Sequence, residues 1–457
     1  MLIINLFPLL RGNNIMRELM PKFVQRFILC YFSSICCLCC ANAYALNNNF
    51  DLILSEPTIT NILDLQGSLL IIPENQTLTF NGGIIKNGTV LFNNTKIVNP
   101  CFLNCRFKGS VENYEFNIRE YGAIPDSEND CSLLINDIIR LKTSPINRGN
   151  PKRIFIPKGI YHIDHPIDLF AGYEAPITLF GEGNMSTICQ RHDNDYIIRV
   201  FEINHVRDLR LTYKNKQTLK NSRSIAIACQ RSIFSIFENL TICKAHTAFG
   251  YITMYDQKNG YNPTGLFDQC YVSDNFRNIR IYETAGYAFD FKKEIPQGDS
   301  GSAYDNIYIN NSGWLGNKNI DSTISAIRGD NTVATFTQLN IEGDNYSSSL
   351  IDLEGYSRVC IQSLHIEGLK DIPTIASLKL QSILHAEIID LQFCQFLREK
   401  YYMFFTEGNA IIDVSGLCIR ADCTIENNNG KRLRNETSTY SSINIQTIID
   451  GTKTNWQ

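Results

Sequence analysis

Seven short segments of this 457-residue chain repeat one alternation of apolar and polar residues, and this repeat limits the fold more than any other feature. In each six-residue segment the fourth and sixth positions are apolar, with a polar residue between them. The segments are a weaker first copy, Val206–Leu211, and then Phe237–Ile242, Phe276–Ile281, Tyr304–Ile309, Phe336–Ile341, Ile361–Ile366 and Ala386–Leu391. Their starts lie 25 to 39 residues apart, a period typical of stacked structural repeats.

Each segment is predicted to be a strand in one coil of a parallel β-helix. A period of two residues is the pattern of a half-buried strand. The segments are too short and too rich in β-branched residues to be the helices of an ankyrin or tetratricopeptide repeat. Because a solenoid grows by adding coils, the chain length fits one such body as well as two ordinary domains. The sequence therefore predicts an all-β solenoid.

The N-terminus has the features of an export signal. Lys22 and Arg26 precede an apolar run at 27–40, and Ala43-Tyr44-Ala45 fits a small-residue cleavage site. A membrane anchor is the alternative, but the run is shorter than the ~20 residues that span a bilayer. We therefore expect a signal peptide over 1–45, a secreted, periplasmic or cell-surface protein, and no membrane span after cleavage.

Charge and cysteine content exclude several classes of function. Removing the expected signal removes four basic residues and one acidic residue, which changes the formal net charge from −4 to −7. Such a chain is not expected to bind nucleic acid. Eleven of the 16 cysteines remain, without a Cys-x-x-Cys or Cys/His metal spacing. No metal or cofactor is therefore expected, and free cysteines are expected to serve as small core residues.

A small β head is predicted ahead of the main body, over 46–114. Short β-rich segments between residues 78 and 98 are separated by Asn81-Gly82 and Asn87-Gly88. Both dipeptides are turn signals, of a hairpin or of a solenoid corner.

A short helix is predicted at the start of the main body, from Cys131 to about Lys142, with Asp130 as its N-cap. Its apolar stripe consists of Leu134, Ile135, Ile138, Ile139 and Leu141. The β-helix is expected to occupy 115–420. The polar segment 421–457 is expected to form a looser C-terminal cap or tail.

Four motifs follow one another between residues 115 and 190. They are Tyr121-Gly122-Ala123, Asp126 with Asp130, Pro157-Lys158-Gly159-Ile160-Tyr161 and Gly181-Glu182-Gly183. Their order resembles the opening of the pectate lyase-like, phage-tailspike-type right-handed β-helices, which include the rhamnogalacturonase/epimerase-like pectate lyase domain. The resemblance implies a single-stranded right-handed parallel β-helix with a short N-terminal capping helix. Ser127 and Cys131 depart from the Gly and Thr that the family prefers.

The same resemblance implies a polysaccharide as the partner, bound by the outer face, and a homotrimer as an assembly to test. The motifs themselves build the first coils and their cap, so they indicate a fold more than a chemistry. Neither Gly-His-Gly nor Asn-Thr-Asp occurs in the sequence, so the catalytic set of the polygalacturonases is absent.

The phase of the repeat predicts which side chains face outward. The fourth and sixth positions point into the solenoid, so the fifth and the following seventh position point out. The fifth position holds Arg210, Thr241, Arg280, Tyr308, Asn340, His365 and Asp390. The seventh holds Thr212, Cys243, Tyr282, Asn310, Glu342, Glu367 and Gln392. The third position carries Asn239, Asn278 and Asn306 on successive coils, and stacked Asn side chains can form a ladder at a corner.

Glu342 and Glu367 are the candidate catalytic pair, with His365 beside them. In adjacent coils in register, their Cβ atoms would lie ~4.8 Å apart. Like charges this close destabilise a sheet, unless a shared proton, a cation or a functional role compensates. Carboxyl groups about 5 Å apart also suit a retaining glycosidase. The alternative is that each Glu, followed by Gly, ends a strand and is solvated or ion-paired.

The candidate substrate-binding residues come from the same face and one loop: Asn340, Tyr308, Tyr282, Arg280 and Trp314. Trp314 lies in the sequence Ser312–Gly316 and would be a sugar-stacking platform or a core plug.

Two classes of function remain open from the sequence. The first is an exported polysaccharide-processing enzyme, a glycoside hydrolase or a lyase. A lyase would need a basic residue, for which Arg280 and Arg328 are the central candidates, and no Asp cluster for calcium is evident. Hydrolysis is therefore favoured. The second is a non-catalytic glycan-binding or surface-structural β-helix, and an epimerase is a weaker third.

Overall fold

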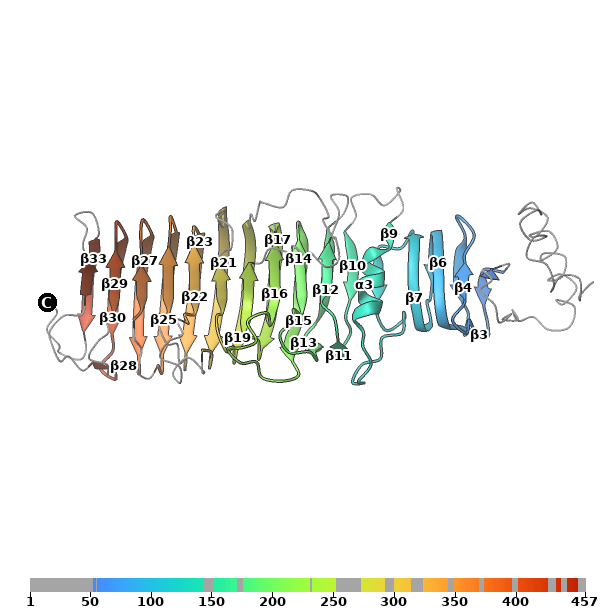
Figure 1. Ribbon diagram of the computed structural model, residues 1–457, viewed down its shortest axis with the longest axis horizontal. Coiled ribbons are helices and arrows are strands. Elements are labelled where there is room, and N and C mark those ends of the chain that lie inside the picture. Colours follow the sequence, from blue (N-terminus) through green and yellow to red (C-terminus); the bar gives the residue numbers. More distant parts are fainter. Residues whose placement is uncertain are drawn as a thin grey trace, which may run out of the picture.

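The structure is a computed structural model, and it forms a long stack of parallel coils (Figure 1). It describes residues 52–54, 56–143, 151–170, 176–230, 232–251, 273–291, 300–313, 324–343, 349–369, 374–396, 402–425, 433–436 and 442–450. The expected signal peptide and Trp314 lie outside these residues. Every pair of named strands is parallel, which confirms the predicted right-handed parallel β-helix.

Two sheets run along the stack. The long sheet has 13 strands: β8 (Glu115–Asn117), β10 (Lys152–Phe155), β11 (Gly159–Ile163), β13 (Ile177–Gln190), β15 (Asn204–Tyr213), β17 (Ile233–Cys243), β19 (Ser273–Tyr282), β21 (Ser300–Asn310), β23 (Val333–Glu342), β25 (Arg358–Glu367), β27 (Ile383–Gln392), β30 (Ile411–Ile419) and β33 (Ser442–Asp450). The short sheet has ten: β12 (Ile167–Phe170), β14 (Ile198–Phe201), β16 (Ile225–Gln230), β18 (Thr247–Tyr251), β20 (Phe289–Phe291), β22 (Ile327–Asp330), β24 (Ile351–Glu354), β26 (Ala376–Leu378), β29 (Phe404–Glu407) and β32 (Leu433–Glu436). A small pair, β28 (Gln395–Phe396) and β31 (Thr424–Ile425), lies beside them.

The predicted repeat coincides with the register of the long sheet. Successive copies align position by position, as in Phe237 opposite Phe276 and Leu240 opposite Ile279. The same alignment continues through β21, β23, β25 and β27. The fourth and sixth positions are buried in all seven copies. The period of two therefore identified the inner side chains correctly, whereas three of the predicted outward side chains, Thr212, Thr241 and Cys243, are buried as well.

Aromatic rings stack along the interior of the long sheet. The rings of Phe237 and Phe276 are 4.9 Å apart, those of Phe276 and Tyr304 4.5 Å, and those of Tyr304 and Phe336 4.4 Å. All four side chains are fully buried. Parallel in-register strands place identical positions one above another about 4.8 Å apart, so each of these four coils adds one ring to the stack.

The third position of the repeat makes a ladder at a corner of the coils. Asn239, Asn278 and Asn306 all adopt positive φ, between 53° and 54°, a conformation that Asn tolerates better than most residues. Nδ2 of Asn278 donates to Asn239 Oδ1 at 3.0 Å, and Nδ2 of Asn306 donates to Asn278 Oδ1 at 2.9 Å. Asn239 continues the ladder to Asp208 at 2.9 Å. The ladder thus stabilises the bend that divides each long strand.

A β head precedes the main stack and shares its parallel pairing. It consists of β1 (Leu52–Ile53), β2 (Thr58–Ile59), β3 (Ile62–Asp64), β4 (Leu69–Ile71), β5 (Thr77–Phe80), β6 (Ile84–Val98), β7 (Phe102–Val111) and β9 (Lys142–Thr143). Asn87, at φ 58°, lies within β6, and Gly88 faces Leu65 so closely that a Cβ would approach it to 2.4 Å. The two Asn-Gly turns are therefore corners of coils rather than hairpins.

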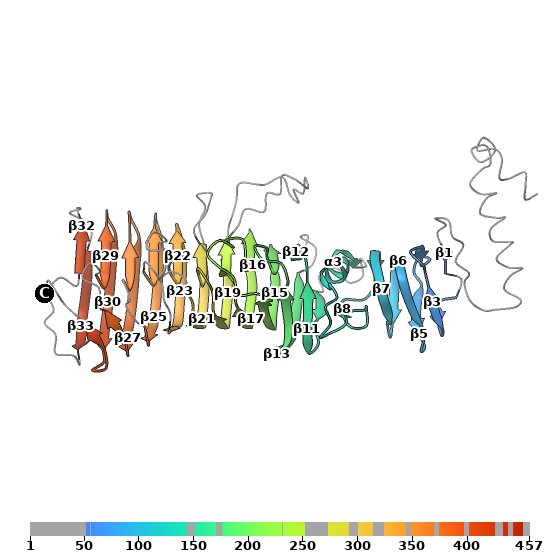
Figure 2. The same cartoon turned by 60° about the horizontal axis from the view of Figure 1, so that its bottom comes forward.

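The predicted helix is α3 (Ser132–Arg140), which lies between the head and the coils in both views (Figures 1 and 2). The expected N-cap was wrong by one residue: Cys131 occupies that position without a side-chain cap. Asp130 Oδ1 instead accepts hydrogen bonds from the backbone N–H of Ser132 and of Asp164, both at 2.9 Å. This carboxylate therefore connects the start of α3 to the strand region that follows.

The far end of α3 is held by a buried lysine. Lys152 Nζ donates to the carbonyl oxygens of Ile139 at 2.7 Å and Ile138 at 3.3 Å, and burial lowers the pKa of Lys152 to about 8. Asp137 accepts hydrogen bonds from Arg106 at 2.5 and 2.9 Å. The helix is thus tied to both the head and the first coils.

The strand ladder continues beyond residue 420, where a looser cap was expected to begin. β33 pairs with β30 from Ile411 opposite Ser442 to Ile419 opposite Asp450. A further copy of the repeat, Val414–Ile419, lies just before residue 420, and the segment that starts at Ile445 pairs with it in register. Seven of the ten described cysteines are buried. Among the residues that the structure describes, no helix is long and apolar enough to cross a membrane.

Candidate functional site

The long sheet brings the predicted outward side chains into two adjacent rows. Along one row Tyr282 lies opposite Asn310, Asn310 opposite Glu342, and Glu342 opposite Glu367. Along the other, Tyr308 lies opposite Asn340 and Asn340 opposite His365. Direct pairing at about 4.8 Å between strands places this whole set on one face, over β19 to β25. We call it the outer-face site.

Glu342 is held by two side chains from the preceding coil. The hydroxyl of Tyr308 donates to Glu342 Oε2 at 2.5 Å, and Asn310 Nδ2 lies 3.4 Å from the same oxygen. Asn310 also donates to the Tyr308 hydroxyl at 3.0 Å. Burial, followed by the hydrogen bond to the Glu342 carboxylate, raises the pKa of Tyr308 to about 12. The phenol therefore stays protonated at neutral pH and orients this carboxylate.

His365 lies between two carboxylates. Its Nε2 is 3.3 Å from Glu367 Oε2, and its Nδ1 is 3.1 Å from Asp390 Oδ2. Arg420 donates to both oxygens of Asp390, at 3.0 and 2.6 Å. The side chain of His365 is 22% exposed and that of Glu367 is 37% exposed, so this part of the site is open to solvent on one side.

The chain from Arg420 to His365 fixes the imidazole. The hydrogen bonds from Arg420 lower the pKa of Asp390 below its usual range, so Asp390 is ionised and acts as an acceptor. We infer that Nδ1 of His365 carries the hydrogen that it donates to Asp390. Nε2 then faces Glu367 and Glu342, and one N or O atom from each of these three side chains lies within 4.8 Å of the other two.

The lowered pKa of Asp390 predicts a pH dependence of stability. A carboxyl whose pKa is lower in the folded protein stabilises the fold above its unfolded pKa of about 3.9, and this stabilisation is lost as the pH falls through the folded pKa. Asp390→Asn is therefore expected to melt below the wild type at pH 7, with a difference that shrinks below about pH 4. Thermal melting between pH 7 and pH 3 measures this. Glu387→Gln, an exposed change on the same strand, should follow the wild type throughout, and a constant difference for Asp390→Asn would contradict the assignment.

The other predicted site residues differ in their involvement. The rings of Tyr282 and Tyr308 lie 5.9 Å apart at 60°, Arg280 is exposed opposite Tyr308, and Asn340 is half-buried. Trp314 lies outside the described residues. Arg328 is on β22 of the short sheet, where it binds both oxygens of Asp290, at 2.9 and 2.5 Å. It is therefore on a different sheet from the carboxylate pair.

Three partners were not selected from the sequence: Asn310, Asp390 and Arg420. The first two belong to the outward rows, so the repeat already placed them on this face. Arg420 follows the copy that starts at Val414, which the sequence reading did not recognise because its third residue is Gly416 and its fifth is Cys418. Recognising that copy would have placed Cys418 opposite Asp390, and Arg420 close to that aspartate.

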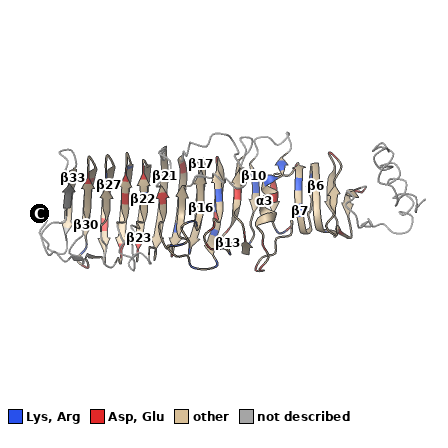
Figure 3. Ribbon diagram, viewed as in Figure 1, with Lys and Arg blue, Asp and Glu red and all other residues tan. Residues whose placement is uncertain are grey.

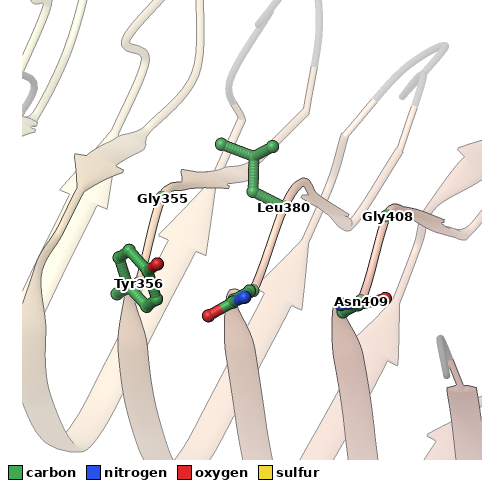
Figure 4. Close-up of a pocket in the computed structure, with 6 residues that line it drawn as sticks. Gly355, Tyr356, Leu380, Gly408 and Asn409 are labelled. Atoms are coloured by element: carbon green, nitrogen blue, oxygen red, sulfur yellow. The ribbon is translucent and has the colours of Figure 1, made fainter.

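A pocket of about 250 Å³ lies at another corner of the coils, lined by Gly355, Tyr356, Leu380, Gln381, Gly408 and Asn409 (Figure 4). None of these residues belongs to the outer-face site. Figure 3 shows basic residues mostly between β7 and β16, while acidic residues mark the coils toward the C-terminus. The outer-face site thus lies in the acidic half.

The fold and this face define the class: a right-handed parallel β-helix with two glutamates and a histidine clustered on its long sheet. Residues 115–231 match the family described as "Rhamnogalacturonase A/epimerase, pectate lyase-like". This match confirms the resemblance seen in the motifs of the first coils. It ends before β19, so it does not include the outer-face site.

Two solved structures of low identity are similar to this chain over most of its length. The tailspike gp42 of Acinetobacter phage vb_AbaP_AS12 is 8% identical over 75% of this chain and 62% of its own, with a TM-score of 0.46. The catalytic unit of a GH87 α-1,3-glucanase from Streptomyces thermodiastaticus strain HF3-3 is 12% identical over 72% and 70%, with a TM-score of 0.35. The chain thus spans less than two thirds of the tailspike. No curated protein matches the sequence.

Proposed function

We propose that this protein is exported and hydrolyses an extended polysaccharide that binds along the outer face of the long sheet. The observation that carries the proposal is the register of Glu342 with Glu367 on adjacent coils, with their side chains clustered around His365. Retaining glycosidases use two carboxyl groups about 5–5.5 Å apart. The family match of the first coils supports a pectate lyase-like relative, and polysaccharides suit such a long, flat face.

The environments of the two glutamates differ in a way that assigns their roles. Glu342 accepts hydrogen bonds from Tyr308 and Asn310, which fix the position of its carboxylate on this face, so we assign it as the nucleophile. Glu367 contacts His365, with which it can share a proton, so we assign it as the acid and base. Glu342 would attack the anomeric carbon while Glu367 protonates the leaving oxygen. Water activated by Glu367 would then release the sugar with its configuration retained.

The rest of the face fits a sugar chain that runs along the stack. Tyr282 and Tyr308 lie one coil apart, and their rings offer the apolar surface on which sugars stack. Arg280 and Asn340 supply exposed and half-exposed polar groups from the neighbouring row. We infer that the glycan crosses several coils, with the scissile bond over Glu342 and Glu367.

A non-catalytic glycan-binding protein is the second candidate. The observation that favours it is the ion-paired network of Arg420, Asp390, His365 and Glu367, which already satisfies these groups as a surface ladder would. A lyase is less well supported, because Arg328 is bound by Asp290 on the other sheet. Of the two basic residues considered for a lyase, only Arg280 then remains as a candidate.

Incubating the protein with a panel of acidic and neutral polysaccharides tests the proposal. New reducing ends indicate cleavage, and absorbance by an unsaturated uronate identifies a lyase. The Glu342→Gln/Glu367→Gln double variant should bind the same glycan without cleaving it. Binding without product by the wild type as well would establish the second candidate instead. Recovery of the protein from outside the producing cell, with its N-terminus near residue 46, tests export.

A further inference from the structure

We propose that Glu342, His365 and Glu367 bind one divalent transition-metal ion of the Zn²⁺ or Mn²⁺ type. One ligand atom from each side chain lies within 4.8 Å of the other two. Zinc is held by imidazole nitrogen and carboxylate oxygen at about 2.0–2.2 Å, so ligand atoms around one ion lie up to about 4 Å apart. Small rotations of these partly exposed side chains are enough to close that difference.

The orientation of His365 is the second argument for an ion. Asp390 accepts from Nδ1 and is itself held by Arg420, which leaves the lone pair of Nε2 pointing at Glu367 Oε2, 3.3 Å away. In this tautomer Nε2 carries a lone pair, so a cation placed between it and the Glu367 carboxylate would be bound by both side chains. Metal-bound histidines commonly donate their other ring N–H to a carboxylate, as His365 does to Asp390.

The local charge favours a cation. Arg420 neutralises Asp390, so the three ligands retain the two negative charges of Glu342 and Glu367. Tyr308 and Asn310 orient Glu342 from the coil above. An imidazole and two carboxylates are typical ligands of Zn²⁺ and Mn²⁺, whereas Ca²⁺ prefers six to eight oxygen atoms.

The metal site uses the same side chains as the proposed hydrolase, but it does not depend on hydrolysis. A carboxylate that coordinates an ion can act neither as a nucleophile nor as a proton donor. Bound Zn²⁺ is therefore expected to inhibit glycan cleavage, and a chelator is expected to restore it.

Titration calorimetry of the chelator-treated full chain with ZnCl₂ tests the site, with MnCl₂ and CaCl₂ as comparisons. We expect one ion per chain, at least about 10-fold weaker binding for Glu342→Gln and for His365→Ala, and a loss of about 10- to 100-fold for Asp390→Asn. Two matched controls should bind like the wild type. His385→Ala removes another histidine paired with an aspartate, Asp413 at 3.4 Å, and Glu387→Gln removes an exposed glutamate of the same strand as Asp390.

Three results would overturn the site: unchanged affinity in His365→Ala, equal loss in the controls, or tighter binding of Ca²⁺ than of Zn²⁺. Absence of ion binding by the wild type would refute the site outright. Circular dichroism confirms that each variant retains its strands. Because these titrations contain no glycan, a protein that binds Zn²⁺ but cleaves nothing refutes only the proposed hydrolase, and cleavage without metal binding refutes only the metal site.

Discussion

Glu342→Gln is expected to lower the rate of glycan cleavage by at least about 100-fold, and Glu367→Gln by about 10²- to 10⁴-fold. Glutamine keeps the size and hydrogen-bonding shape of each side chain but can neither attack the anomeric carbon nor transfer a proton. The two side chains are partly exposed on the outer face, so neither change disturbs the hydrophobic core. Initial rates of reducing-end release, measured on the glycan that the wild type cleaves, give the effect.

Three further variants make this prediction specific. Glu387→Gln, exposed on β27, should retain the rate of the wild type. Tyr308→Phe should lose less than Glu342→Gln, because it removes only the group that positions the carboxylate. Glycan affinity should be retained in Glu342→Gln. An unchanged rate in both glutamine variants would remove this face from the reaction.

Phe276→Ala is expected to destabilise the fold by about 3–5 kcal/mol, the range for deleting a buried aromatic ring. Phe276 is fully buried and stacks between Phe237 and Tyr304, with ring centroids 4.9 and 4.5 Å away. The ring also meets the edge of Phe249 at 5.1 Å. Because every coil contacts only its neighbours, the cavity interrupts the stack in the middle of the solenoid. Urea unfolding followed by circular dichroism measures the loss.

Tyr356→Ala is the matched control for that loss. This aromatic side chain is 67% exposed at a corner of the coils, and surface substitutions usually change stability by no more than about 0.5 kcal/mol. If Phe276→Ala unfolds at the same urea concentration as Tyr356→Ala, the ring stack does not contribute to stability as described.

The repeat predicted the solenoid because its signal is local and recurs. Leu240 and Ile242 show the period of a strand within six residues, and the same pattern at Ile279 and Ile281 shows that the strand is stacked. The helix was found from its apolar stripe, but its N-cap is Cys131 rather than the predicted Asp130. An N-cap depends on the backbone angles of one residue, which a pattern does not determine.

The end of the ladder was harder to locate. The copies at Val414 and Ile445 have Gly416 and Thr447 at the third position, and the polar residues between them gave the impression of a looser cap. Strand pairing with a preceding coil compensates for a weak local signal, since the neighbouring backbone supplies the hydrogen bonds. That neighbouring strand comes from another part of the chain, so it is present only in the folded stack and not in the local sequence.

The sequence by itself determined the coil, its inner and outer faces and the corner asparagines, because all three follow from a period of two residues. It also placed Glu342, Glu367 and His365 on one face, since equal positions of successive copies must stack. The tertiary structure alone decided which atoms meet: that Tyr308 binds Glu342, that Arg420 holds Asp390, and that Asp390 orients His365. These contacts join residues 25 to 34 positions apart through side-chain rotations, which no repeat in the sequence specifies.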